Sequence, residues 1–182
     1  LGHRIDKAEW EKRVPVLREK LLDVQYDLKQ LRKFPVVVVV GGVDGAGKSE
    51  SVNTITSWLD PRHVMVHALG IPNDEEAERP EMWRFWRALP PKGRLGIFQG
   101  SWYTRPIIER VFDRRTQLAF DADLERIVRF ERLLADEGAA VVKFWLHLSK
   151  KAQKKRLEEL ANDKKTAWRV TDAGSKNGTA IS

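Results

Sequence analysis

The stretch Val36-Val-Val-Val-Val-Gly-Gly-Val-Asp-Gly-Ala-Gly-Lys-Ser49 decides the fold of this 182-residue chain. Five consecutive valines make a short, apolar, β-branched run, which is typical of a strand that is buried on both faces. The segment from Gly42 to Ser49 then matches the phosphate-loop pattern Gly-x-x-x-x-Gly-Lys-Ser. A segment that can form a helix, residues 50–59, follows at once. The motif therefore has the strand–loop–helix context that it requires.

The residue types in this loop suit a site for phosphate groups. Glycines permit positive φ angles, so that successive backbone N–H groups can converge on phosphate oxygens. The N-terminus of the following helix adds partial positive charge, Lys48 adds a full one, and the Ser49 hydroxyl can ligate Mg²⁺. The structural alternative is a glycine-rich turn without a ligand. The sequence predicts phosphate binding by Gly42, Gly45, Ala46, Gly47, Lys48 and Ser49.

The composition limits the class of protein. A chain of this length forms one domain-sized unit with its own core. The 33 Lys and Arg residues against 26 Asp and Glu residues give a net charge of +7. Such a charge suits a polyanionic partner (nucleic acid, polymeric phosphate or an anionic membrane) or serves solubility alone. The chain has no cysteine, which excludes disulfides and thiolate metal sites.

Targeting and boundary signals are few. No apolar run approaches the about 18 residues of a membrane-spanning helix, and no signal peptide opens the chain. We therefore expect a cytoplasmic protein without a membrane partner. The chain begins at Leu1 rather than Met and ends in a small, polar stretch without periodicity, residues 173–182. We interpret residues 1–172 as one domain and the whole chain as a piece of a longer polypeptide.

An amphipathic helix is predicted over residues 6–32, where apolar residues recur at alternating steps of three and four. Asp6 and Glu9 stand in capping positions, and Pro15 either kinks the helix or marks its start. We expect the helix to pack on the sheet, with a dimer interface as the alternative. Its apolar residues are Val14, Leu17, Leu21, Val24, Leu28 and Leu31.

Three further strands alternate with helices along the rest of the chain. The strands are expected at residues 63–68, 94–98 and 139–148, and the helices at 72–87, 106–115, 121–137 and 149–160. Alternation of this kind favours an α/β fold with a parallel sheet and helices on both faces.

Other residues permit a functional and a structural interpretation. His63 and His67 are too few for a metal site, so we expect them to be solvated or satisfied in the core. The segment Pro80–Arg87 interleaves three aromatic residues with two arginines, which could stack bases or bind phosphates. We favour a core role for the aromatic residues and leave the arginines open. The stretch Asp113–Arg115 is expected to be exposed.

Short segments spread over almost the whole chain make it similar to the polyphosphate kinase 2 family of P-loop phosphotransferases. The likeness is greatest to the N-terminal half of two-domain members that resemble polyphosphate:AMP phosphotransferases. It implies a three-layer P-loop kinase-like fold with a helical lid. The matching segments, in the family's order, are Gly41–Lys48, Trp83-Arg84, Leu89–Gly93, Ser101–Tyr103, Glu109–Val111, Phe130–Arg132, Lys143–Lys150 and Trp168–Val170.

The resemblance also implies an activity and roles for individual residues. Members move a phosphoryl group between inorganic polyphosphate and a nucleoside mono- or diphosphate, here AMP or ADP, with Mg²⁺. Asp44 would be the catalytic or metal-organising aspartate, Ser49 would assist the metal, and Lys48 would bind phosphate. Arg110 and the basic residues near Arg114 would lie in or beside the lid. The family also leads us to expect a homo-oligomer.

Gln99 and Gly100 depart from the family's pattern. Active members carry Asp-Arg or Asn-Arg here, just before Ser-x-Tyr. A carboxylate at a strand end holds Mg²⁺ and an adjacent arginine neutralises developing charge, and such a group is worth about 2.7–4 kcal/mol. The sequence therefore leaves two functions open: a phosphotransferase domain with impaired catalysis, or a catalytically degenerate domain that binds phosphate or has a structural role. A nucleic-acid-binding ATPase is a third class, and no helicase or RNA-reading motif accompanies it.

Overall fold

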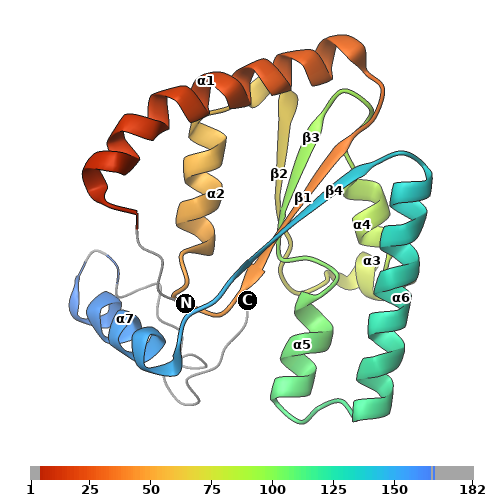
Figure 1. Cartoon of the computed structure of the whole chain (residues 1–182). Coiled ribbons are helices and arrows are strands. Elements are labelled where there is room, and N and C mark those ends of the chain that lie inside the picture. The colour runs from red at the N-terminus through yellow and green to blue at the C-terminus, as the bar shows by residue number, and fades with distance from the viewer. Residues whose placement is uncertain (1–4, 165, 167–182) are drawn as a thin grey trace.

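The computed structural model describes residues 5–164 and residue 166 (Figure 1). The predicted match at Trp168–Val170 and the predicted tail, residues 173–182, lie outside the described residues. In chain order the elements are α1 (Lys7–Leu31), β1 (Val36–Gly42), α2 (Lys48–Ser57), the 3₁₀ helix η1 (Pro61–His63), β2 (Val64–Ala68), α3 (Asp74–Ala77), α4 (Trp83–Ala88), β3 (Leu95–Gln99), α5 (Thr104–Val111), α6 (Gln117–Asp136), β4 (Ala140–Leu146) and α7 (Lys150–Asn162).

The strands form one parallel sheet in the order β2-β3-β1-β4. β1 therefore lies between β3 and β4, with Val40 beside Gln99 and Gly42 beside Leu146. In open parallel sheets, ligands bind outside the carboxyl ends of the strands, where the strand order changes direction. Because the phosphate loop follows β1 directly, the topology puts the loop at this position.

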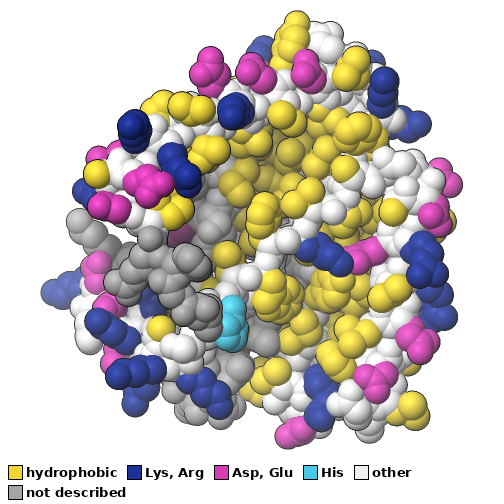
Figure 2. Space-filling model, in the orientation of Figure 1, with side chains coloured by type: hydrophobic (Ala, Val, Ile, Leu, Met, Phe, Trp, Pro, Cys, Tyr) yellow, Lys and Arg dark blue, Asp and Glu magenta, His cyan; other side chains and the backbone are white. Residues whose placement is uncertain are grey.

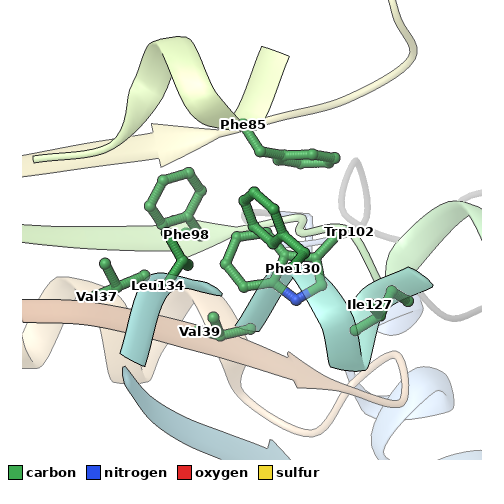
Figure 3. Close-up of a cluster of buried hydrophobic side chains, with 8 residues drawn as sticks. All are labelled: Val37, Val39, Phe85, Phe98, Trp102, Ile127, Phe130 and Leu134. Carbon is green, nitrogen blue, oxygen red and sulfur yellow. The ribbon is translucent and has the colours of Figure 1, made fainter. Parts of the chain in front are cut away.

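Helices cover both faces of the sheet, as predicted, and the valines of β1 point alternately to each face. On one face α4 and α6 pack over Val37 and Val39 (Figure 3). On the other face α1 and α2 pack over Val38 and Val40. The first cluster consists of Val37, Val39, Phe85, Phe98, Trp102, Ile127, Phe130 and Leu134, and the second of Leu28, Val38, Val40, Val52, Leu59, Leu95 and Ile97.

The N-terminal helix packs on the sheet over only part of its length. It begins at Lys7, where the Asp6 carboxylate accepts a hydrogen bond of 3.0 Å from the backbone N–H of Ala8. Pro15 lies inside the helix, so the idea that it marks the start is wrong. Leu28 is buried, but Val24 and Leu31, on the predicted apolar face, are each 62% exposed. The predicted packing is therefore confirmed only in part.

Two expectations about polar residues need correction. The strand expected at residues 63–68 begins at Val64, because His63 lies in η1. The side chain of Arg115 is not exposed: it forms ion pairs with Glu109 and with the buried Asp123. Among residues 5–164 and 166, no group of three or more His, Cys, Asp or Glu side chains is arranged to hold a metal ion. In the same part of the chain, no helix combines the length and apolar character needed to cross a bilayer.

The aromatic and arginine side chains of α4 have mainly structural contacts. Phe85 is buried in the core, whereas Trp86 is 43% exposed. Arg84 donates a hydrogen bond of 3.0 Å to the carbonyl of Gly70 and forms an ion pair with Glu76. The core interpretation is thus confirmed for Phe85, and Arg84 has a structural partner.

Candidate phosphate-binding site

The loop after β1 begins at a backbone position that only glycine can occupy. Gly42 has a φ of 139°, and a Cβ there would lie 2.0 Å from the carbonyl oxygen of Leu146. Gly45 and Gly47 have φ angles of 76° and 89°, and Gly47 is the N-cap of α2. Gly47 therefore gives α2 no side-chain cap, and an uncapped helix N-terminus is a position that favours an anion.

Lys48 is the first residue of α2 and folds back over the loop. Its side chain is buried, and Nζ donates to the carbonyls of Gly42 at 3.0 Å and Val43 at 3.3 Å. The Asp44 carboxylate lies 3.3 Å from the same nitrogen. Burial lowers the pKa of Lys48, and the charge of Asp44 opposes this effect. The loop thus holds a partly desolvated cation, whose interaction with an incoming phosphate is stronger than in water.

Ser49 is joined to the end of β3. The side-chain amide of Gln99 donates a hydrogen bond of 2.8 Å from Nε2 to the Ser49 hydroxyl oxygen. Gln99 is the last residue of β3 and lies beside Val40 of β1. A neutral amide, which donates its N–H to Ser49, therefore occupies the position where the family resemblance leads us to expect a carboxylate that holds Mg²⁺.

Gly100 leaves no room for a side chain. Its φ is 80°, and a Cβ would lie 2.2 Å from the carbonyl oxygen of Leu69. The backbone N–H of Leu69 donates to the Gln99 carbonyl at 3.0 Å, which holds the two segments together. An arginine at this position would require the backbone to move.

The metal-ligand candidates are Asp44 and Ser49. A carboxylate and a hydroxyl are the oxygen ligands that Mg²⁺ takes, and this ion usually adds substrate phosphates and water to one or two protein carboxylates. The two residues fit such a partial set. Both are engaged in the structure, Asp44 with Lys48 and Ser49 with Gln99.

Gln153 of α7 is a part of the site that the sequence analysis missed. It is only 4% exposed, and its Nε2 donates a hydrogen bond of 3.1 Å to the backbone carbonyl of Asp44. The signal was present, because Gln153, Leu157 and Leu160 recur at steps of four and three on one side of the helix. α7 is thus fastened to the phosphate loop.

Arg110 lies apart from these residues. It sits on α5 and forms an ion pair of 3.2 Å with Asp113. Among the described residues, no hydrogen bond or ion pair connects Arg110 to the phosphate loop. The structure therefore brings together Asp44, Lys48, Ser49 and Gln99 but not Arg110, whose role in a lid stays a prediction.

A polar network supports the segment after Gly100. Glu131 of α6 accepts hydrogen bonds from Trp102 Nε1 at 3.1 Å and from the Tyr103 hydroxyl at 2.8 Å. Lys143 of β4 pairs with the same carboxylate at 2.7 Å. Burial and the adjacent carboxylate raise the pKa of Tyr103, so its hydroxyl stays a donor. The network ties the end of β3 to α6 and β4.

Comparison with known proteins gives matches over almost the whole chain. A family model described as "Polyphosphate kinase 2 (PPK2)" matches residues 4–180. A polyphosphate:AMP phosphotransferase of Pseudomonas aeruginosa is 48% identical over 171 residues, which cover 94% of this chain. An AMP/ADP-polyphosphate phosphotransferase of Meiothermus ruber is 33% identical over 154 residues, or 85% of this chain and 58% of that protein.

A solved structure shares the fold. The crystal structure of polyphosphate kinase 2 from Arthrobacter aurescens TC1 superposes with a TM-score of 0.87 at 27% identity, covering 94% of this chain and 62% of that one. The present chain spans only 34% of the length of the Pseudomonas relative.

Proposed function

Because the chain belongs to the polyphosphate kinase 2 family, we propose that it is a phosphotransferase domain that acts on inorganic polyphosphate and an adenine nucleotide, AMP or ADP. The observation that carries the proposal is the phosphate loop itself, in which Lys48 and the uncapped start of α2 meet at the carboxyl end of β1. The names of the relatives support the substrate class.

The loop residues would act mainly by positioning and by neutralising charge. Phosphoryl transfer requires little covalent chemistry from the protein, so rate comes from alignment and electrostatic stabilisation. Backbone N–H groups from Gly45 to Ser49 would bind the oxygens of a phosphate group, and Lys48 would turn from its carbonyl partners to the same group. Arg110 would contribute only after α5 moved toward the loop.

We propose Mg²⁺ as the metal ion, with Asp44 and Ser49 as the protein ligands. When bound, the ion would neutralise charge on the phosphate oxygens. The Asp44 carboxylate would then exchange its contact with Lys48 for the metal. The Ser49 hydroxyl can keep its hydrogen bond from Gln99, because the oxygen has a second lone pair.

Reduced or lost catalysis is the second candidate, and two observations favour it. The amide of Gln99 binds Ser49, and the backbone at Gly100 excludes an arginine side chain. Gln99 in place of the family's carboxylate, or Gly100 in place of its arginine, removes a charge-stabilising group. A group of this kind is worth about 10²–10³ in rate. The chain would then bind phosphate groups in a longer protein without transferring them.

The experiment that tests the proposal is phosphoryl transfer from polyphosphate to AMP or ADP with Mg²⁺, measured as ADP or ATP formed. Lys48→Ala is the paired variant, and calorimetric binding of tripolyphosphate is measured on both proteins. Transfer that the variant loses supports the enzyme. Tripolyphosphate binding without transfer supports the second candidate, and absence of both in folded protein contradicts phosphate-loop function altogether.

We also propose that the chain self-associates, in part through α1. This helix exposes apolar side chains along its length, among them Leu17, Val24 and Leu31. Sedimentation velocity over a range of protein concentrations measures the oligomeric state, and a monomer at every concentration would contradict the proposal.

A further inference from the structure

The first half of α7 carries a row of lysines, Lys150, Lys151 and Lys154, which we call the α7 lysine row. All three side chains are exposed, and among the described residues no ion pair joins them to a carboxylate. The acidic residues of the helix, Glu158 and Glu159, lie in its second half, and Glu159 pairs there with Lys155 and Arg156. Figure 2 shows Lys and Arg side chains gathered over this helix.

The α7 lysine row begins next to the phosphate loop. The buried Gln153, within this same stretch, holds the carbonyl of Asp44. The N–H of Val43 donates at 3.1 Å to Leu146, at the end of β4, only four residues before Lys150. Lys150 and Lys154 are one turn apart and share a side of the helix. α7 thus carries further positive charge on an element that is hydrogen-bonded to the phosphate loop.

The chemistry of α7 favours a polymer of phosphate without bases. Proteins that bind single-stranded nucleic acid combine positive charge with aromatic side chains on which bases stack. α7 has no aromatic residue. Its lysines offer compact charges that suit phosphate oxygens without directional demands.

We propose that the α7 lysine row is an extension of the phosphate site that binds the distal phosphates of a long polyphosphate chain. This inference rests on the proposed phosphate-loop function and adds to it a preference for long chains. Lysines that have no carboxylate partner bind a linear polyanion favourably, because binding releases the counterions condensed on it.

The test compares binding of tripolyphosphate and of long-chain polyphosphate to the whole chain by isothermal titration calorimetry. The variant Lys150→Gln/Lys151→Gln/Lys154→Gln is paired with Lys12→Gln/Lys20→Gln/Lys29→Gln on α1, which removes the same charge elsewhere. We expect the α7 variant to lose roughly tenfold in long-chain affinity and about two units of salt slope, and to bind tripolyphosphate within about twofold of wild type. The triple Lys→Arg variant on α7 should keep long-chain affinity.

Several results would overturn the inference. Equal long-chain affinity of the wild type and the α7 variant contradicts it, as does an equal loss in the α1 variant. Single-stranded DNA that binds the row as tightly as polyphosphate assigns it to nucleic acid instead. If tripolyphosphate binds but affinity does not increase with chain length, this inference alone is contradicted. If neither tripolyphosphate nor long-chain polyphosphate binds, the proposed function is contradicted as well.

Discussion

Gln99 Nε2 lies 2.8 Å from Ser49 Oγ, so the end of β3 is joined to the first turn of the phosphate-loop helix. This hydrogen bond puts an uncharged group next to the serine that follows Lys48. The loop therefore combines features that suit phosphate with a neighbour that offers a metal ion no negative charge. The relationship makes position 99 the most informative site for a substitution.

Gln99→Asp should strengthen the effect of Mg²⁺. The new carboxylate would stand beside Ser49 and add a second acidic ligand to Asp44, and hard oxygen ligands of this kind favour Mg²⁺. We expect Mg²⁺ to raise the affinity for tripolyphosphate about tenfold more in this variant than in wild type, which corresponds to about 1.4 kcal/mol. Any phosphoryl transfer should rise by up to about 10²-fold. Calorimetry with and without Mg²⁺ measures the first effect, and an equal response from Gln99→Asn would contradict it.

Gly100→Ala should destabilise the fold more than Gly138→Ala. Both glycines have positive φ angles, 80° and 85°, which cost a residue with a Cβ about 1–2 kcal/mol. At Gly138 no atom lies within 4 Å of the added carbon, whereas at Gly100 the carbonyl oxygen of Leu69 lies 2.2 Å away. We expect the free energy of unfolding to fall by about 1–2 kcal/mol in Gly138→Ala and by a clearly larger amount in Gly100→Ala, measured by urea unfolding. Equal losses in the two variants would mean that the backbone at Leu69 shifts at little energetic cost.

The close approach of Leu69 to Gly100 also affects the double change Gln99→Asp with Gly100→Arg. The family resemblance favours it as a restoration of the missing pair. The structure indicates that the second half of the change carries a conformational cost at Leu69. The single substitution at 99 is therefore the better test of the charge argument.

The sequence predicted most of the fold because its signals are local. The valine run and the glycine pattern fix β1 and the phosphate loop without any tertiary information. Helix faces were less predictable. On α6, Leu133 and Val128 fit the apolar period but are 45% and 52% exposed, whereas Asp123 is buried. Asp123 can be buried because Arg115 and Arg126, eight and three residues away, form ion pairs with it, and the period of the apolar residues does not register such pairs.

The sequence named candidate residues for the site but not the contacts between them. Lys48 and Ser49 follow from the motif, and Asp44 from the family resemblance. The Gln99–Ser49 hydrogen bond joins residues 50 positions apart, and the Gln153–Asp44 bond joins residues 109 apart. Such contacts arise from strand order, which the alternation of strands and helices leaves undetermined.

Asp123→Asn should cost about 3 kcal/mol of stability. Asp123 is 2% exposed and forms ion pairs with Arg115 and Arg126. Removal of one member of a buried ion pair typically costs about 3–5 kcal/mol, and the remaining Glu109 partner of Arg115 puts the expected loss at the lower end. Urea unfolding followed by circular dichroism measures it. Asp136→Asn, on the exposed side of the same helix, should stay within about 0.5 kcal/mol of wild type, and a similar loss in both variants would contradict the buried-pair argument.

Lys48 should make both stability and anion binding depend on pH. Burial lowers its pKa in the folded protein below the ordinary value of 10.5, so between the two values the unfolded chain binds more protons. The contribution of Lys48 to the free energy of unfolding therefore rises with pH across this interval. Comparison of urea unfolding of wild type with Lys48→Met across this interval isolates that contribution.

Binding of an anion shifts the pKa of Lys48 in the opposite direction. A phosphate beside Lys48 favours the charged form and raises its pKa again, so complex formation takes up a proton. We expect the affinity for tripolyphosphate to fall as pH rises through the lowered pKa of Lys48, by up to about tenfold per pH unit. Calorimetry in two buffers of different ionisation enthalpy measures the proton uptake directly. Lys48→Arg keeps its charge over this range, so its affinity should stay level, and a parallel decline in both proteins would assign the effect to another group.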